Sequence, residues 1–188
     1  MSQQIANYLG KGITPGQFAD GMTKNQDSFR AVLSGFEWQD ADTESFFESL
    51  NNRDDLRCVI IAADWCGDVV RNIPVVFSAM EKGGIPTEVF IMEQHLDLID
   101  QFLVMGGRSL PVVLIADTGG HVLGKWGPRP KYIQEPMVAF KQANPDREAA
   151  DYQDNLTAAR KEIMARYGEG TGYQKLILEE LRDVLSGV

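Results

Sequence analysis

The segment Arg57-Cys58-Val59-Ile60-Ile61-Ala62-Ala63-Asp64 leads directly into Trp65-Cys66-Gly67-Asp68-Val69. Its first part is a nearly continuous apolar run, which is typical of a central strand buried on both faces. Its second part has the outline of a redox-active Cys-x-x-Cys motif, in which one thiolate attacks a disulfide and the other thiol resolves the product. Val69 stands where the second cysteine would be. This chain therefore cannot close that disulfide ring.

Strands and helices alternate downstream of this segment. A helical pattern begins at Gly67 and stops at Gly83-Gly84, with Pro74 inside it as an expected kink. The sequence further predicts strands at 88–92 and 111–116, a short helix at 95–105, and a hairpin turn at 118–120 that leads into a strand at 121–126. The order strand, helix, strand, helix, strand, strand indicates an α/β fold.

Both ends of the chain have helical patterns. Thr14-Pro15 supplies a capping residue and a first-turn proline, and further helices are predicted over 27–34, ending at Gly35, and from Thr43. A long amphipathic helix is predicted over 146–167, followed by glycines and a last helix. We expect one domain over residues 1–188, with a helical extension at 1–50, a core at 51–143 and a second helical extension at 144–188.

Composition narrows the classes of function. The net charge of −9 and the pI near 4.7 argue against nucleic acid and against an anionic membrane surface as partners, because both require a basic footprint. No apolar run approaches the roughly 18 residues of a membrane-spanning helix, and the N-terminus lacks the pattern of a signal peptide. Two cysteines in 188 residues fit a reducing compartment. We therefore expect a cytoplasmic protein with free thiols.

Spaced features between Asn51 and Ala143 resemble the thioredoxin superfamily, and within it the bacterial proteins with a longer N-terminal segment. The family carries Trp-Cys-Gly-Pro-Cys after a buried strand, a proline eight residues beyond the first cysteine, and a later proline in a cis peptide bond. The matching residues are Trp65, Cys66, Gly67, Pro74, Arg108, Leu110, Pro111 and Gly127. The resemblance implies a thioredoxin-like fold, in which a central mixed sheet is flanked by helices.

The same resemblance implies a site built around Cys66. A cysteine at a helix N-terminus faces unpaired N–H groups and the positive end of the helix dipole, which favour the thiolate. Cys66 is thus the candidate nucleophile. A cis-proline loop beside it would offer backbone groups to an extended polypeptide. The candidate substrate-binding residues are Trp65, Gly67, Asp68, Leu110 and Pro111.

Three residues depart from the family pattern. Asp68 and Val69 replace Pro-Cys, and Ile60 occupies the position of the family's buried strand carboxylate, six residues before the first cysteine. Asp68 also has a plainer role, because an acid in the first turn stabilises a helix, and its charge opposes the thiolate. The proton-handling carboxylate and the resolving thiol are therefore missing together, which leaves Cys66 alone to carry any thiol chemistry.

The remaining chemistry-bearing residues predict little. On an extended strand Cys58 would lie about 26 Å from Cys66, whereas a disulfide needs Cα atoms within about 7 Å, so we expect a buried thiol. His95 and His121 lack the spacing of metal ligands, and the pairs Gly106-Gly107 and Gly119-Gly120 lack the pattern of a phosphate-binding loop. We expect neither a metal nor another cofactor.

The leading hypothesis is a monothiol thiol–disulfide oxidoreductase. Cys66 would attack a mixed disulfide between a protein and a low-molecular-weight thiol, and a second small thiol would release it. Oxidation of Cys66 to a sulfenic acid that signals peroxide is a related option.

The alternative is a non-catalytic scaffold that binds partners beside Trp65 and Pro111. Metal-cluster binding across a dimer is less well supported, because the Cys-Gly-Phe-Ser motif is absent. A homodimer is a further possibility, since the apolar faces of the terminal helices need covering.

Overall fold

The computed structural model describes residues 3–188 of the chain. Its centre is a four-stranded sheet in the order β2-β1-β3-β4, in which β1 pairs parallel with β2 and antiparallel with β3, and β3 pairs antiparallel with β4. The strands are β1 (Leu56–Ala62), β2 (Thr87–Ile91), β3 (Val112–Asp117) and β4 (Val122–Trp126). This mixed sheet with flanking helices confirms the predicted fold class.

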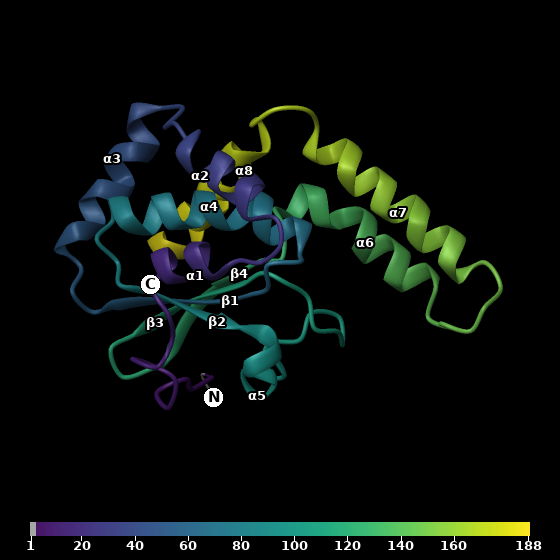
Figure 1. The fold of residues 1–188 in the computed structure, drawn as a ribbon, viewed down its shortest axis with the longest axis horizontal. Coiled ribbons are helices and arrows are strands. Elements are labelled where there is room, and N and C mark those ends of the chain that lie inside the picture. The colour runs from purple at the N-terminus through teal and green to yellow at the C-terminus, as the bar shows by residue number, and fades with distance from the viewer. Residues whose placement is uncertain (1–2) are drawn as a thin grey trace.

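The helices form a layer against the sheet and a projection beside it. In Figure 1, α2, α3, α4 and α8 lie together on one side of the strands, while α6 and α7 form a hairpin that extends away from the sheet. The α-helices are α1 (Pro15–Gly21), α2 (Gln26–Ser34), α3 (Ala41–Ser49), α4 (Gly67–Lys82), α5 (Leu96–Ile99), α6 (Lys131–Ala143), α7 (Tyr152–Tyr167) and α8 (Tyr173–Ser186). Two 3₁₀ turns, η1 (Leu50–Asn52) and η2 (Met92–Gln94), complete the elements.

The strand β1 is buried on both faces, as its apolar run predicts. The side chains from Cys58 to Ala62 are all 0% exposed. Ile60 lies between Val89 of β2 and Val113 of β3. A strand enclosed in this way has no room for a solvated side chain, which is why no charged residue stands between Arg57 and Asp64.

The N-terminal helices pack onto α4. Thr14 caps α1 as predicted: its hydroxyl accepts the Gln17 N–H, and the Gln17 side chain accepts the Thr14 N–H. The rings of Phe18, Phe29 and Phe77 then meet edge to face, with centroids 5.7–6.4 Å apart, and join α1 and α2 to α4. The helix α4 continues through Pro74 from Gly67 to Lys82.

The helix predicted over 95–105 is shorter in the structure. Only Leu96–Ile99 is α-helical, and the chain then makes a tight turn in which Val104 and Gly107 exchange backbone hydrogen bonds of 2.9 and 3.0 Å. Met105 and Gly106 hold the positive φ angles, +49° and +76°, that this turn requires. The prediction was wrong because the backbone after Ile99 makes i→i−3 hydrogen bonds, from Gln101 to Leu98 and from Phe102 to Ile99, and does not continue the α-helix.

The helix predicted from Asp146 begins later, at Tyr152. The carboxylate of Asp146 accepts the backbone N–H of Glu148 at 2.9 Å, so it holds a local turn instead of a helical one. The C-terminal end is as predicted: α7 ends at Tyr167, before Gly168 with φ +70°. Within residues 3–188, no helix is both long and apolar enough to cross a membrane.

Candidate functional site around Cys66

Cys66 occupies the N-cap position of α4. A short connection, residues 63–65, joins it to the end of β1. The connection is fixed from the side, because the Asp64 carboxylate accepts the backbone N–H groups of Thr23 and Lys24 at 2.9 and 3.1 Å. The Asn25 side chain also donates to the Asp64 carbonyl at 2.9 Å. The N-terminal helical extension thereby holds the cysteine-bearing turn in place.

The Cys66 thiol points toward the loop that precedes β3. Its Sγ lies 3.7 Å from the carbonyl oxygen of Leu110, to which the S–H donates, and the residue is 9% exposed. Burial raises the pKa of this thiol; the Asp68 charge raises it further, while the Val69 and Asp68 N–H groups and Arg129 oppose the shift. Cys66 is therefore mostly protonated at neutral pH.

The peptide bond between Leu110 and Pro111 is cis in the structure. Gly127, at the end of β4, passes against this loop: a Cβ at Gly127 would lie 2.3 Å from the Pro111 carbonyl oxygen. Only glycine allows this approach and the φ of +117° that accompanies it. Arg108 forms a two-point ion pair with Asp100, at 2.6 and 2.8 Å, and so ties the loop to the end of α5.

Trp65 lies beside Cys66 and remains half exposed, at 50%. Its indole N–H donates to the Glu93 carboxylate, which fixes one edge of the ring to the η2 turn. Trp65 therefore presents an exposed ring beside the thiol, whereas its role in substrate binding stays a prediction. Gly67 starts α4, and its carbonyl accepts a weak hydrogen bond from Arg71 at 3.4 Å.

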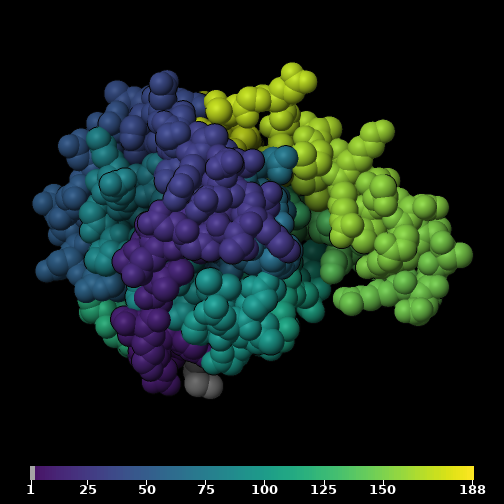
Figure 2. All heavy atoms as spheres, viewed as in Figure 1, coloured from purple at the N-terminus to yellow at the C-terminus, as the bar shows by residue number. Residues whose placement is uncertain are grey.

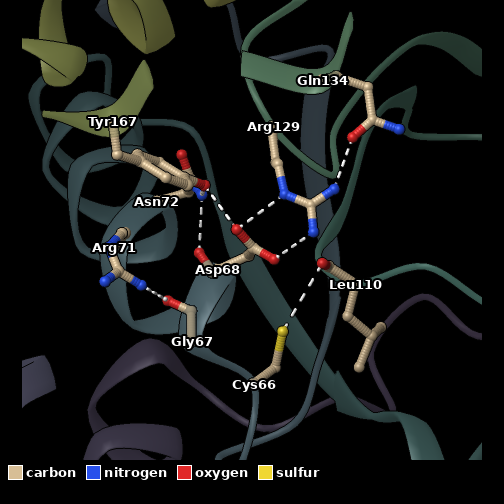
Figure 3. Close-up of polar contacts among 9 residues, drawn as sticks. All are labelled: Cys66, Gly67, Asp68, Arg71, Asn72, Leu110, Arg129, Gln134 and Tyr167. Carbon is tan, nitrogen blue, oxygen red and sulfur yellow. Dashed lines mark hydrogen bonds and ion pairs between the residues drawn. The ribbon is translucent and has the colours of Figure 1, made fainter. Parts of the chain in front are cut away.

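The Asp68 carboxylate accepts three hydrogen bonds from residues that the sequence did not predict to lie near it (Figure 3). Arg129 donates to both carboxylate oxygens, at 2.9 and 2.8 Å, and the Tyr167 hydroxyl donates to one of them at 2.6 Å. The side chains of Asp68 and Arg129 are only 17% and 15% exposed. The expected first-turn acid is therefore also the centre of a polar cluster that sequence reasoning missed.

Asn72, one turn further along α4, completes this cluster. Its amide N–H groups donate to the Asp68 carbonyl and to the Tyr167 hydroxyl, both at 2.8 Å, and the residue is 0% exposed. Its Oδ1 has no hydrogen-bond partner among residues 3–188. Burial, and next the Asp68 charge, raise the pKa of the Tyr167 phenol, so its hydroxyl keeps its proton and acts as a donor.

Two sequence signals could have pointed to the missed residues. Arg129 stands between two prolines directly after the Gly127 match, where a flexible surface arginine is unexpected. Tyr167 continues the apolar stripe of its helix four residues beyond Ile163. Neither signal names Asp68 as the partner, since the pairs are separated by 61 and 99 residues along the chain.

The other candidate residues lie away from the Cys66 site. Cys58 is fully buried in β1, burial raises its pKa to about 12, and both cysteines are free thiols. His121 pairs with Asp117 in the hairpin turn at 2.9 Å, and His95 packs edge to face on Phe90. Within residues 3–188, no three His, Cys, Asp or Glu side chains gather as metal ligands would.

Comparison with known proteins agrees with this architecture. A thioredoxin family model matches residues 12–153, which include the N-terminal helices as well as the sheet. The chain belongs to the thioredoxin family. No curated protein gives a significant match.

Two crystal structures are similar in fold. One is an HIV epitope scaffold, with a TM-score of 0.61, 16% identity and 99% of each chain covered. The other is a protein of unknown function from Pseudomonas aeruginosa, with a TM-score of 0.50, 16% identity, and 100% of this chain and 93% of that one covered. At this level of identity both structures support the fold alone.

Proposed function

We propose that this protein is a monothiol thiol–disulfide oxidoreductase that acts through Cys66. The observation that carries the proposal is the position of the thiol: Cys66 Sγ lies at the start of α4, 3.7 Å from the carbonyl of the residue before Pro111. A disulfide substrate that lies along the loop would meet this sulfur. Val69 and Ile60 occupy the positions of the resolving thiol and of the proton-handling carboxylate, so neither group accompanies Cys66.

The proposed reaction has two exchange steps. The Cys66 thiol first loses its proton to solvent, and its thiolate attacks one sulfur of a mixed disulfide between a polypeptide and a small thiol such as glutathione or bacillithiol. The polypeptide leaves as a thiolate, which takes up a proton, and Cys66 is left bonded to the small thiol. A second small thiol, as its thiolate, then attacks that bond and releases Cys66 and a small-molecule disulfide. No resolving cysteine is required.

The raised pKa of Cys66 sets the pH dependence of this exchange. Only the thiolate attacks, so below the pKa the rate rises about tenfold per pH unit. Because the pKa of Cys66 lies above that of an ordinary thiol, the exchange rate should still rise with pH at values where an unperturbed cysteine is already ionised. We expect low activity near pH 7 and a plateau only in the alkaline range.

The test measures release of the free peptide thiol from an S-glutathionylated peptide, together with formation of glutathione disulfide, with free glutathione as the second thiol. Wild type and Cys58→Ala should accelerate release, and Cys66→Ser should not. The Cys58→Ala variant is the matched control because it removes the buried thiol and leaves Cys66 in place. Equal release by wild type and folded Cys66→Ser would overturn the proposal.

The second candidate is a non-catalytic binding protein, in a reducing bacterial cytoplasm, that uses the same surface. It is favoured by the half-exposed Trp65 and by the burial of Cys66, which raises the pKa of the thiol and so favours its protonated form. It predicts that Cys66→Ser retains binding to a thiol-free partner peptide while Trp65→Ala loses it. Peptide binding by Cys66→Ser together with absent exchange by wild type would favour this function.

A further inference from the structure

The polar cluster around Asp68 joins the cysteine-bearing helix to the C-terminal half of the chain. Asp68 belongs to the first turn of α4, Arg129 to the loop between β4 and α6, and Tyr167 is the last residue of α7. Gln134 of α6 accepts a further hydrogen bond from Arg129 at 2.6 Å. Figure 3 shows Arg129 and Tyr167 converging on the Asp68 carboxylate, with Gln134 bound to Arg129 and with Cys66 and Leu110 close by.

The cluster is largely removed from water, which makes its charges matter. The Asp68 and Arg129 side chains are at most 17% exposed, and Asn72 beneath them is fully buried. Two parallel hydrogen bonds between a guanidinium and a carboxylate fix both groups in orientation as well as in distance. The Tyr167 hydroxyl occupies a further position on the same carboxylate.

Cys66 lies within reach of these charges. The charged groups that act on its sulfur are Asp68, from its own helix, and Arg129, from the β4–α6 loop. Asp68 disfavours the thiolate and Arg129 favours it, so while the ion pair is intact the guanidinium offsets part of the effect of the carboxylate on the thiol. Tyr167 is the titratable group on the far side of Asp68.

We propose that Arg129 and Tyr167 are positioning residues for Cys66: by holding and neutralising the Asp68 carboxylate, they set how readily the neighbouring thiol reacts. Because Gln134 and Tyr167 come from α6 and α7, the seating of the helical hairpin then influences the reactivity of the thiol. The C-terminal extension thereby takes part, through Asp68, in the chemistry of the site.

The test follows alkylation of Cys66 by iodoacetamide as a function of pH, in a Cys58→Ala background. Arg129→Gln leaves the Asp68 charge uncompensated, and should shift the alkylation midpoint to higher pH and slow alkylation at neutral pH about threefold or more. Asp68→Asn should do the opposite. Arg129→Gln should shift the midpoint less in an Asp68→Asn background than in wild type, because there it removes only the direct effect of the guanidinium on the thiol and leaves no carboxylate unpaired.

Conservative variants separate this role from a structural one. Arg129→Lys keeps the charge and should retain most of the wild-type midpoint, and Tyr167→Phe should shift it less than Arg129→Gln. Arg182→Gln is the matched control, because it breaks an exposed ion pair with Asp42 elsewhere on the surface. Circular dichroism and thermal midpoints identify variants that fail to fold.

An unchanged alkylation midpoint in folded Arg129→Gln would overturn the proposal. Equal shifts of the midpoint by Arg129→Gln in the wild-type and Asp68→Asn backgrounds would also overturn it. The measurement needs no disulfide substrate, so it decides this proposal even if Cys66 proves inactive in thiol–disulfide exchange.

Discussion

At the scale of single residues, the two cysteines show how position alone decides chemistry. Cys58 is enclosed in the sheet and Cys66 caps a helix beside a loop. Sequence reasoning located both, because a buried apolar run and a helix start are local patterns. It could not foresee that Asp68 is neutralised, because Arg129 and Tyr167 are brought to it only by folding.

Cys58 gives a prediction about stability and pH. An unfolded cysteine has a pKa near 8.5, whereas burial raises that of folded Cys58 to about 12. Between these values the unfolded chain releases a proton that the folded chain keeps, so stability falls as pH rises, by up to about 1.4 kcal/mol per pH unit. The free energy of unfolding of wild type relative to Cys58→Ala should therefore decrease from pH 8.5 upward. Urea titrations at several pH values would measure it, and a constant difference would contradict the prediction.

At the scale of elements, one helix is capped by a side chain from another. The residue before α6 is Pro130, which has no capping side chain, and Glu180 of α8 accepts the Lys131 N–H instead, at 2.7 Å. The same carboxylate accepts the Trp126 indole N–H of β4, also at 2.7 Å. Sequence patterns predict helix starts from local caps, so a cap supplied 49 residues away is outside their reach.

This contact predicts a specific loss of stability. Glu180→Ala removes the acceptor for two N–H groups, and should lower the free energy of unfolding by about 2 kcal/mol. The matched control is Glu179→Ala in the same helix, whose exposed pair with Lys175 at 3.7 Å should contribute about 0.5 kcal/mol or less. Chemical denaturation of both variants tests this, and equal losses would argue against the proposed cap.

At the scale of the whole molecule, the hairpin of α6 and α7 is the outlying part. Figure 2 shows it as a lobe at the side of the body, away from the N-terminal helices. Its tip, between Ala143 and Tyr152, has no regular helix and is largely exposed. Its base is joined to α4 through Asp68, so the tip and the base should differ in local stability.

Limited proteolysis should report that difference. We expect trypsin to cut the folded chain first after Arg147, an exposed residue at the hairpin tip. The two fragments should stay associated, because Tyr167 and α8 remain packed on the core. Mass spectrometry after brief digestion identifies the first cut. Initial cleavage at the base of the hairpin, after Arg166, would show that the base is the weaker part.

Local patterns along the chain are enough to specify the alternation of elements, the buried β1 strand, the single thiol at the start of α4 and the proline loop opposite it. These depend on apolar periodicity, capping and motif spacing, all of which are local along the chain. The surroundings of Asp68, and the contribution of the C-terminal helices to the site, arise only when the chain folds. The physical reason is that a buried charge is tolerated where partners meet it, and those partners converge from distant segments through packing.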